Sequence, residues 1–154
     1  MAKQPLLKLD GFLPYRISVL ANTISTTLAS AYSRQFDLRI PEWRVLATLG
    51  GYPDSSSREV AQRTAMDKVA VSRAVSNLMD QGRVSSAIDS GDRRRTLLRL
   101  SADGEALLAR IVPLAHAYES RLLETLSVEE RVQFESLLHK LMQQASLLSN
   151  QTVE

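Results

Sequence analysis

The chain has 154 residues, a formal net charge of +2 and no cysteine. This length suffices for one domain with a sizeable core, and the lack of cysteine excludes disulfides, thiolate metal sites and cysteine nucleophiles. No apolar run approaches the roughly 18 residues of a membrane span and no secretory signal is visible, so we expect a soluble cytoplasmic protein without a membrane partner.

Residues 9–36 have the pattern of an amphipathic helix. Apolar side chains recur every three or four positions, which places them on one helical face. These residues are Phe12, Leu13, Ile17, Leu20, Ile24, Leu28, Ala31 and Tyr32.

Positive charge gathers in the middle of the chain. Residues 41–100 contain ten Lys and Arg against seven Asp and Glu, or +3, whereas the remaining segments contain nine against ten, or −1. A locally basic segment is typical of a nucleic-acid interface, although so small a difference needs the support of a motif.

Two short helices are predicted on either side of residues 64–66. The first covers residues 58–63, with Val60 and Ala61 facing inward. The second runs from Asp67, its N-cap, to Gly82, and its apolar positions are Val71, Val75, Leu78 and Met79. Two helices joined by a three-residue turn indicate either a helix-turn-helix or an ordinary helical hairpin.

A β-hairpin is predicted next, with strands at residues 84–88 and 96–100. Its turn, residues 89–95, reads Asp-Ser-Gly-Asp-Arg-Arg-Arg, and three successive arginines cannot belong to a core. Such a tip is either a solvated loop or an element that enters the negative minor groove of DNA. Its position directly after the helix pair favours a winged helix-turn-helix.

Two further helices with wide apolar faces are predicted over residues 102–126 and 127–149. We expect Pro113 to bend the first rather than end it, because the periodicity continues beyond it. Residues 127–130 (Ser-Val-Glu-Glu) form a capping box that opens the second. The apolar positions are Leu107, Leu108, Ile111, Val112, Leu114, Tyr118, Leu122, Leu123 and Leu126, then Val132, Phe134, Leu137, Leu138, Leu141, Met142, Ala145 and Leu148.

The helices at both ends have more apolar surface than the segment between them can cover. A second copy of the chain is the simplest partner for that surface. The alternative is a monomer whose terminal helices pack back on the winged module.

Several motifs occur together at characteristic spacing. The wing carries D-x-x-D-R-R as Asp89, Asp92, Arg93 and Arg94, followed by a leucine-rich strand and the helix opening at residues 100–107. Residues 41–46, 67–73 and 82–84 match the start of a second helix, a recognition helix and its exit into the wing. With these motifs the chain resembles the MarR family of bacterial transcription regulators over nearly its whole length. Ser101 stands where the family usually has threonine, and either residue can cap a helix.

The resemblance implies a mainly α fold with a small β-hairpin wing. Residues 1–154 would form a single MarR-like domain, in which 9–36 and 102–149 are dimerisation helices and 41–100 form the winged helix-turn-helix. Such a protein regulates transcription, most often as a repressor. Its obligate homodimer binds double-stranded DNA at a pseudo-palindrome whose half-sites lie about one helical turn apart.

The second helix of the motif would supply most DNA contacts. Ser72 and Arg73 have the chemistry to reach base edges, since Arg with guanine is the commonest specific pair. Val69 or Ala70 could touch a thymine methyl group. Phosphate is as reasonable a partner as base for Lys68, Ser76 and Asn77.

The wing would add minor-groove contacts through Arg94, and also through Arg93. The family motif implies that Asp92 holds one of these arginines by a charge-assisted hydrogen bond. We expect Arg95 to point outward to phosphate or solvent. Arg58, near the start of the first helix of the motif, would meet backbone phosphate or remain solvated.

The family resemblance also implies a small aromatic or phenolic effector, bound between the dimer helices and the winged module. Residues that combine aromatic faces with a polar group there are Tyr15, Arg16, Trp43 and Tyr118. Arg16 would bind an aromatic carboxylate through two hydrogen bonds. The alternative is that Trp43 anchors the second helix in the core and Arg16 lies along the dimer surface.

Other functional classes have little support in the sequence. No phosphate loop, nucleophile–base pair or metal-ligand cluster indicates an enzyme or a cofactor, and His116 and His139 are too far apart in sequence to suggest a metal site. The remaining alternative is a winged-helix protein-interaction module without DNA binding, for which a neutral or acidic wing would be typical.

Overall fold

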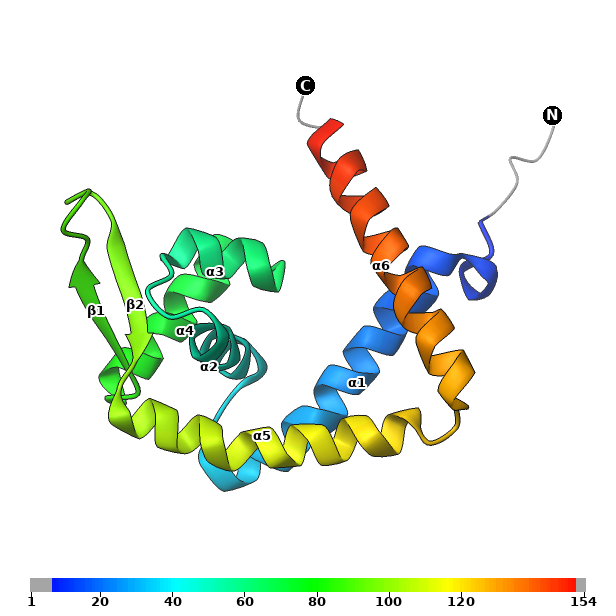
Figure 1. The fold of residues 1–154 in the computed structure, drawn as a ribbon, viewed down its shortest axis with the longest axis horizontal. Coiled ribbons are helices and arrows are strands. Elements are labelled where there is room, and N and C mark those ends of the chain that lie inside the picture. Colours follow the sequence, from blue (N-terminus) through cyan, green and yellow to red (C-terminus); the bar gives the residue numbers. More distant parts are fainter. Residues whose placement is uncertain (1–6, 152–154) are drawn as a thin grey trace. The chain divides into compact units, whose positions relative to one another are not determined.

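The computed structural model describes residues 7–151, and Figure 1 shows the order of the elements. A short 3-10 turn, Leu9–Gly11, precedes six helices and one hairpin: α1 (Leu13–Phe36), α2 (Ile40–Gly51), α3 (Ser57–Thr64), α4 (Lys68–Asp80), β1 (Val84–Ile88), β2 (Thr96–Leu100), α5 (Ala102–Leu123) and α6 (Val128–Gln151). The chain divides into two compact units after Ala115, within α5. None of the helices described is long and apolar enough to cross a membrane.

The core of the first unit gathers around α2, α3 and α4. Its most deeply buried side chains are Tyr32, Leu38, Val45, Leu46, Leu49, Val60, Val71, Leu78 and Ile111. Full burial of one such aliphatic side chain contributes about 1.5–3 kcal/mol, so this cluster carries most of the unit's stability.

Local capping fixes where α3 and α4 begin. The Ser56 hydroxyl accepts from the Glu59 N–H, and the Glu59 carboxylate accepts from the Ser56 N–H at 2.7 Å. The Asp67 carboxylate accepts from the Ala70 N–H at 2.8 Å, which confirms Asp67 as the N-cap of α4. Between the helices, Ala65 takes the left-handed conformation (φ 52°) that ends α3.

One predicted core position of α4 is wrong. Met79 is 39% exposed, whereas Ala74 is buried beside Val71, Val75 and Leu78. The buried positions follow the spacing i, i+3, i+4 and i+7, and the next position lies at the edge of that stripe. Met79 therefore continues the sequence pattern but lies outside the core.

The hairpin forms with the predicted strand limits, and its register pairs Val84 with Leu100 and Ile88 with Thr96. At its base the Ser101 hydroxyl accepts from the Gly104 N–H at 3.1 Å and donates to the Gly82 carbonyl at 2.6 Å, so Ser101 caps α5. Gly104 is required there, because a Cβ would meet the Arg83 carbonyl oxygen at 2.0 Å. In Figure 1 the hairpin stands beside α3 and α4, with its tip directed away from α5.

The two ends of α1 differ in their surroundings. Tyr32 and Phe36, near its C-terminus, are buried, and the Arg110 guanidinium lies 4.8 Å from the centre of the Phe36 ring. The apolar side chains of its first half are exposed: Leu13, Tyr15, Ile17, Val19 and Leu20. The predicted stripe is thus covered only over its last part.

Helix α5 continues through Pro113, which does not end it, as predicted, and reaches Leu123 in the second unit, where α6 follows. The Ser127 N–H donates to the Glu130 carboxylate at 2.7 Å and the Glu130 N–H to the Ser127 hydroxyl at 3.2 Å, which confirms the capping box. No residue of α6 is buried, and its exposed apolar side chains include Val132, Phe134, Leu137, Leu138, Leu141 and Met142.

Candidate nucleic-acid interface

The outer face of α4 presents polar and small apolar groups to solvent. Ser72, Arg73 and Ser76 are exposed there, on the side of the helix away from its buried residues. In the first turn Lys68 and Val69 are exposed and Ala70 is half-buried. Six of the candidate contact residues thus share the accessible surface of one helix.

Asn77 differs from the other candidates on α4. It is half-buried, and its side-chain amide donates to Glu42 Oε1 at 3.1 Å. Glu42, only 3% exposed, also accepts from the Arg39 N–H at 2.9 Å, which opens α2. Asn77 therefore connects α4 to the start of α2. Sequence reasoning missed Glu42, although a glutamate three residues after a helix start is the usual capping signal.

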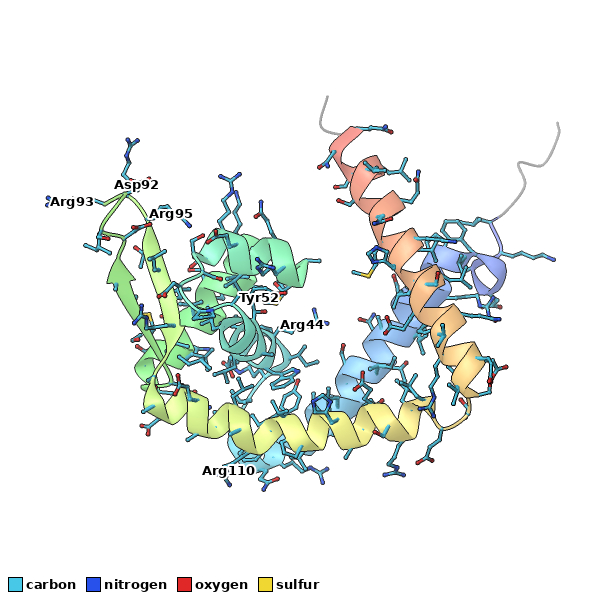
Figure 2. All side chains as sticks on the ribbon, viewed as in Figure 1. Arg44, Tyr52, Asp92, Arg93, Arg95 and Arg110 are labelled. Carbon is cyan, nitrogen blue, oxygen red and sulfur yellow. The ribbon has the colours of Figure 1, made fainter. Side chains whose placement is uncertain are left out.

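The wing tip is organised by Asp92. Its Oδ1 accepts from the Arg94 backbone N–H at 3.0 Å and lies 3.8 Å from Arg94 Nε. The Arg94 side chain is 96% exposed, so Asp92 shapes the turn more than it restrains the guanidinium. Figure 2 shows Asp92 and Arg93 at the tip, with Arg93 pointing away from the hairpin.

Arg95 is directed toward α3, although its side chain remains 45% exposed. Its Nη2 lies 3.2 Å from both carboxylate oxygens of Glu59 on α3, and its Nη1 lies 3.9 Å from Asp89 Oδ2. Figure 2 shows its side chain directed from the wing toward α3. Nothing in the sequence indicates that a carboxylate 36 residues earlier lies beside the wing, and a phosphate contact of Arg95 stays a prediction.

Two further contacts attach β2 to the segment before α3. The Leu98 N–H donates to the Ser55 carbonyl at 2.9 Å, as an isolated β-bridge. Arg99 donates from Nε and Nη2 to Asp54 Oδ1, at 2.9 and 2.6 Å. With the Arg95–Glu59 pair, these contacts hold β2 along most of its length.

Hydrogen bonds and a nearby cation favour the ionised form of Glu59. Its pKa is lowered from the usual value, first by the hydrogen bonds from the Ser56 N–H and hydroxyl, and then by Arg95. The partner that Arg95 meets is therefore a carboxylate at any pH near neutrality.

Arg58 and Lys68 lie on either side of the turn between α3 and α4. Both are exposed and both border a groove that is also lined by Gln62, Met66 and the acidic Asp67, the N-cap of α4. Two cations at one groove can meet a phosphate strand, as expected for positioning contacts.

A single chain does not bring the four effector candidates together. Trp43 is partly buried against the core, with its ring 5.5 Å from that of Tyr32 on α1. Tyr15 and Arg16 are exposed near the other end of α1, sixteen or seventeen residues before Tyr32, which is about 25 Å at 1.5 Å per residue. Tyr118 belongs to the second unit. Trp43 thus anchors α2 to the core, the alternative to an effector contact for this residue.

A separate cavity of about 680 Å³ lies within the first unit. Its walls are the end of α2, the base of β2 and the first half of α5, and they include Leu49, Asp54, Arg99, Leu100, Leu108 and Val112. None of the four predicted effector residues lines it.

Neither histidine belongs to a metal-binding cluster within residues 7–151, where no group of three candidate ligands is found. His116 Nδ1 lies 3.3 Å from Glu119, and His139 Nε2 lies 2.9 Å from the Gln143 amide. Both residues are exposed on their helices.

Three comparisons with known proteins find relatives of this chain. The model of the MarR family matches residues 36–95. The transcriptional repressor Rv2887 of Mycobacterium tuberculosis is 29% identical over 132 residues, covering 85% of this chain and 91% of the relative. A crystal structure of a MarR/EmrR family transcriptional regulator from Acinetobacter sp. ADP1 superimposes with a TM-score of 0.84 at 28% identity, covering 92% of this chain and 99% of the other.

Bordetella bronchiseptica BpsR has the same fold, with a TM-score of 0.78 at 22% identity over 90% of this chain and 98% of that one. Rv2887 is named as a transcriptional repressor and the Acinetobacter protein as a transcriptional regulator. The sequence match, the curated repressor and the shared winged fold agree with one another, and in all three the chain is similar to transcriptional regulators of the MarR family.

Proposed function

We propose that this regulator is a repressor that binds double-stranded DNA sequence-specifically, as a homodimer on a pseudo-palindromic operator. The observation that carries the proposal is the combination of two exposed features on one unit. Arg73 and Ser72 stand on the free face of α4, and Arg93 and Arg94 stand at the wing tip.

Base readout is assigned to the first half of α4. In a major groove the Arg73 guanidinium can donate two hydrogen bonds to the O6 and N7 atoms of guanine. Ser72 can reach a neighbouring base edge, and the exposed Val69 can contact a thymine methyl group. Ser76 and Lys68 serve as phosphate contacts, and Arg58 can add another from α3.

The wing is assigned to the minor groove. Arg94 is the first choice for insertion, because its side chain is almost fully exposed and its backbone is set by Asp92. A narrow A·T-rich groove concentrates negative potential, which favours such an arginine. Asn77, held by Glu42, is assigned to orienting α4 and not to contacting DNA.

Dimer formation follows from the surfaces left uncovered. The apolar side chains of the first half of α1 and of α6 are exposed in one chain. Monomeric proteins rarely expose contiguous apolar surface on this scale, and a second copy is its simplest partner. Two-fold symmetry then presents two copies of α4, which sets the half-sites about one helical turn apart.

A protein-interaction module without DNA binding is less well supported. Such a module has no use for an arginine-rich tip whose Arg94 side chain stays 96% exposed although Asp92 lies 3.8 Å away. A neutral or acidic wing would favour a protein-interaction module without DNA binding.

Release by a small aromatic acid is the second part of the proposal. DNA binding of the structural neighbour BpsR is regulated by 6-hydroxynicotinic acid. Here Arg16 is the proposed partner of a ligand carboxylate, and the aromatic walls would have to come from both chains of the dimer. A ligand that binds more tightly to a dimer with wrongly spaced α4 helices shifts the population away from DNA.

Selection of bound duplexes from random DNA tests the DNA-binding proposal. The enriched sequences should form a pseudo-palindrome, and Arg73→Ala should lose preference at one position of each half-site. Arg121→Ala, which removes an exposed charge from α5, is the matched control and should select the wild-type motif. Failure of the wild-type protein to enrich any motif would refute sequence-specific binding.

Titration of the bound complex with a panel of aromatic acids tests the effector proposal. Arg16→Ala should keep DNA affinity and lose release by the active compound. Leu108→Phe, which fills the separate cavity beside β2, should leave release unchanged. The reverse outcome, with release lost only in Leu108→Phe, would move the effector site to that cavity.

A further inference from the structure

The wing is attached to the helix-turn-helix by side chains as well as by the chain itself. Along β2 the attachments are Arg99–Asp54 near the base, Leu98–Ser55 in the middle and Arg95–Glu59 at the tip end. Only the Arg95–Glu59 pair reaches α3 itself, and it is the attachment nearest to the arginines of the tip.

Glu59 serves two elements with one carboxylate. It closes the capping box of α3, accepting from the Ser56 N–H and hydroxyl at 2.7 Å, and both of its oxygens lie 3.2 Å from Arg95 Nη2. The bonds from Ser56 hold the Glu59 carboxylate in place independently of Arg95. A guanidinium nitrogen that lies between both oxygens of a carboxylate held by other hydrogen bonds is restricted in position.

The pair cannot contribute much to folding stability. Both side chains are more than two-fifths exposed, and exposed ion pairs have small net effects on unfolding. The Arg95–Glu59 pair can still restrain the direction of the wing tip, because this does not require a large interaction energy. Arg95 lies immediately beside Arg94, so restraining Arg95 also restrains the direction in which the tip points.

We propose that Glu59 is a positioning residue for DNA recognition, which acts through Arg95 to aim the wing arginines Arg93 and Arg94 at the minor groove. This inference rests on the proposed function. It reverses the sequence-based role of Arg95, which becomes an internal restraint of the wing and not a phosphate contact.

The first experiment measures wing orientation without DNA. Because the chain has no cysteine, spin labels can be placed with Ser90→Cys on the wing and Gln62→Cys on α3. Labelled chains are mixed with excess unlabelled protein so that only intrachain distances are recorded by double electron–electron resonance. The distance distribution should be narrow in the parent and clearly broader in Glu59→Gln and Arg95→Gln. An unchanged distribution in both variants would refute the restraint.

Glu59→Gln is chosen because a glutamine oxygen can still accept from the Ser56 N–H. The cap of α3 is thereby retained while the charge that holds Arg95 is removed. Arg95→Lys is the conservative partner, and it should keep part of the narrow distribution because its ammonium can still pair with Glu59. Thermal unfolding of each variant checks that the fold is intact.

The second experiment is a double-mutant cycle on DNA affinity. Wild type, Glu59→Gln, Arg95→Gln and the double variant are titrated with the selected operator, with A·T-rich or G·C-rich flanks. Each single variant should reduce the preference for A·T flanks about two- to fivefold, a range compatible with an exposed ion pair. The double variant should lose no more than either single one, because all three break the same restraint. Lys8→Gln, which removes an exposed charge outside the assigned DNA-binding and dimerisation segments, is the charge-matched control and should leave the preference intact.

Different outcomes distinguish the two proposals. If wild type binds no operator, the proposed function fails and the wing distances still test the restraint. If wild type binds, additive losses in the cycle overturn the positioning role. A salt slope lowered by about one unit in Arg95→Gln alone also overturns it, since that is the signature of a lost phosphate contact.

Discussion

Helices α4 and α6 carry similar amphipathic patterns and have different surroundings. In α4 the apolar positions Val71, Val75 and Leu78 are buried by α2 and α3 within the same chain. In α6 the apolar positions, among them Leu138 and Leu141, are exposed along its length. The same periodicity therefore marks an internal core in α4 and an uncovered apolar face in α6, which the proposed dimer would cover.

The contrast separates two tasks of the molecule. A helix that presents side chains to DNA must be held rigidly by its own unit, which requires a covered inner face. A helix that joins two chains must leave its apolar face free until the partner arrives. The predictions below test this division, from the largest expected effect to the smallest.

Charges placed on the apolar face of α6 should separate the dimer. Leu138→Glu combined with Leu141→Glu would bury four carboxylates in a two-fold interface, which should weaken association by at least about a hundredfold. Sedimentation velocity at micromolar concentration should then show monomers. Ser136→Glu with Gln143→Glu adds the same charge on the opposite face and should remain dimeric; equal behaviour of the two pairs would refute the assignment of this face.

A buried leucine of α4 should matter far more than its exposed neighbour. Leu78→Ala should lower the free energy of unfolding by about 2–5 kcal/mol, because it leaves a cavity in the core. Met79→Ala should cost less than about 1 kcal/mol, since that side chain is outside the core. Chemical denaturation followed by circular dichroism measures both. Similar losses for the two variants would place Met79 in the core after all.

Periodicity predicted the fold well because the strongest signals in this sequence are local. The hairpin limits, the N-cap at Asp67 and the capping box at residues 127–130 all follow from short-range patterns, and all are confirmed. Pairings between distant segments were missed, among them Arg95 with Glu59 and Asn77 with Glu42. A single sequence does not show which surface charges will meet. The face of α6 is also undecided by sequence, since an uncovered stripe looks the same as a covered one.

Removing an arginine from α4 should change operator binding differently from removing one from the wing. Arg73→Ala should cost about 1–3 kcal/mol on the specific operator and relax one base position. Arg94→Ala should also weaken binding, with the larger loss on operators whose flanks are A·T-rich. Titrations on a matched set of operators measure both effects. Uniform weakening by both substitutions would contradict the division between base readout and minor-groove insertion.

Alkaline pH should destabilise the first unit through Tyr32. Burial raises the pKa of its phenol from 10.0 to about 12, and the nearby Arg44 opposes this shift. A raised folded-state pKa means that the unfolded chain loses the proton first, so stability should fall as pH rises above about 10. The loss is about 1.4 kcal/mol per pKa unit. Tyr32→Phe should flatten this part of the profile, and an unchanged slope would show that other groups cause it.

The central claim is that two chains read one DNA site, with the terminal helices joining them and α4 with its wing reading the bases. Sedimentation equilibrium of the protein on the selected duplex tests it most directly. The account predicts two chains per full operator, and binding at least about a hundredfold weaker on a duplex that holds a single half-site, because one reading surface is lost. One chain per operator, with equal affinity for the half-site, would contradict it.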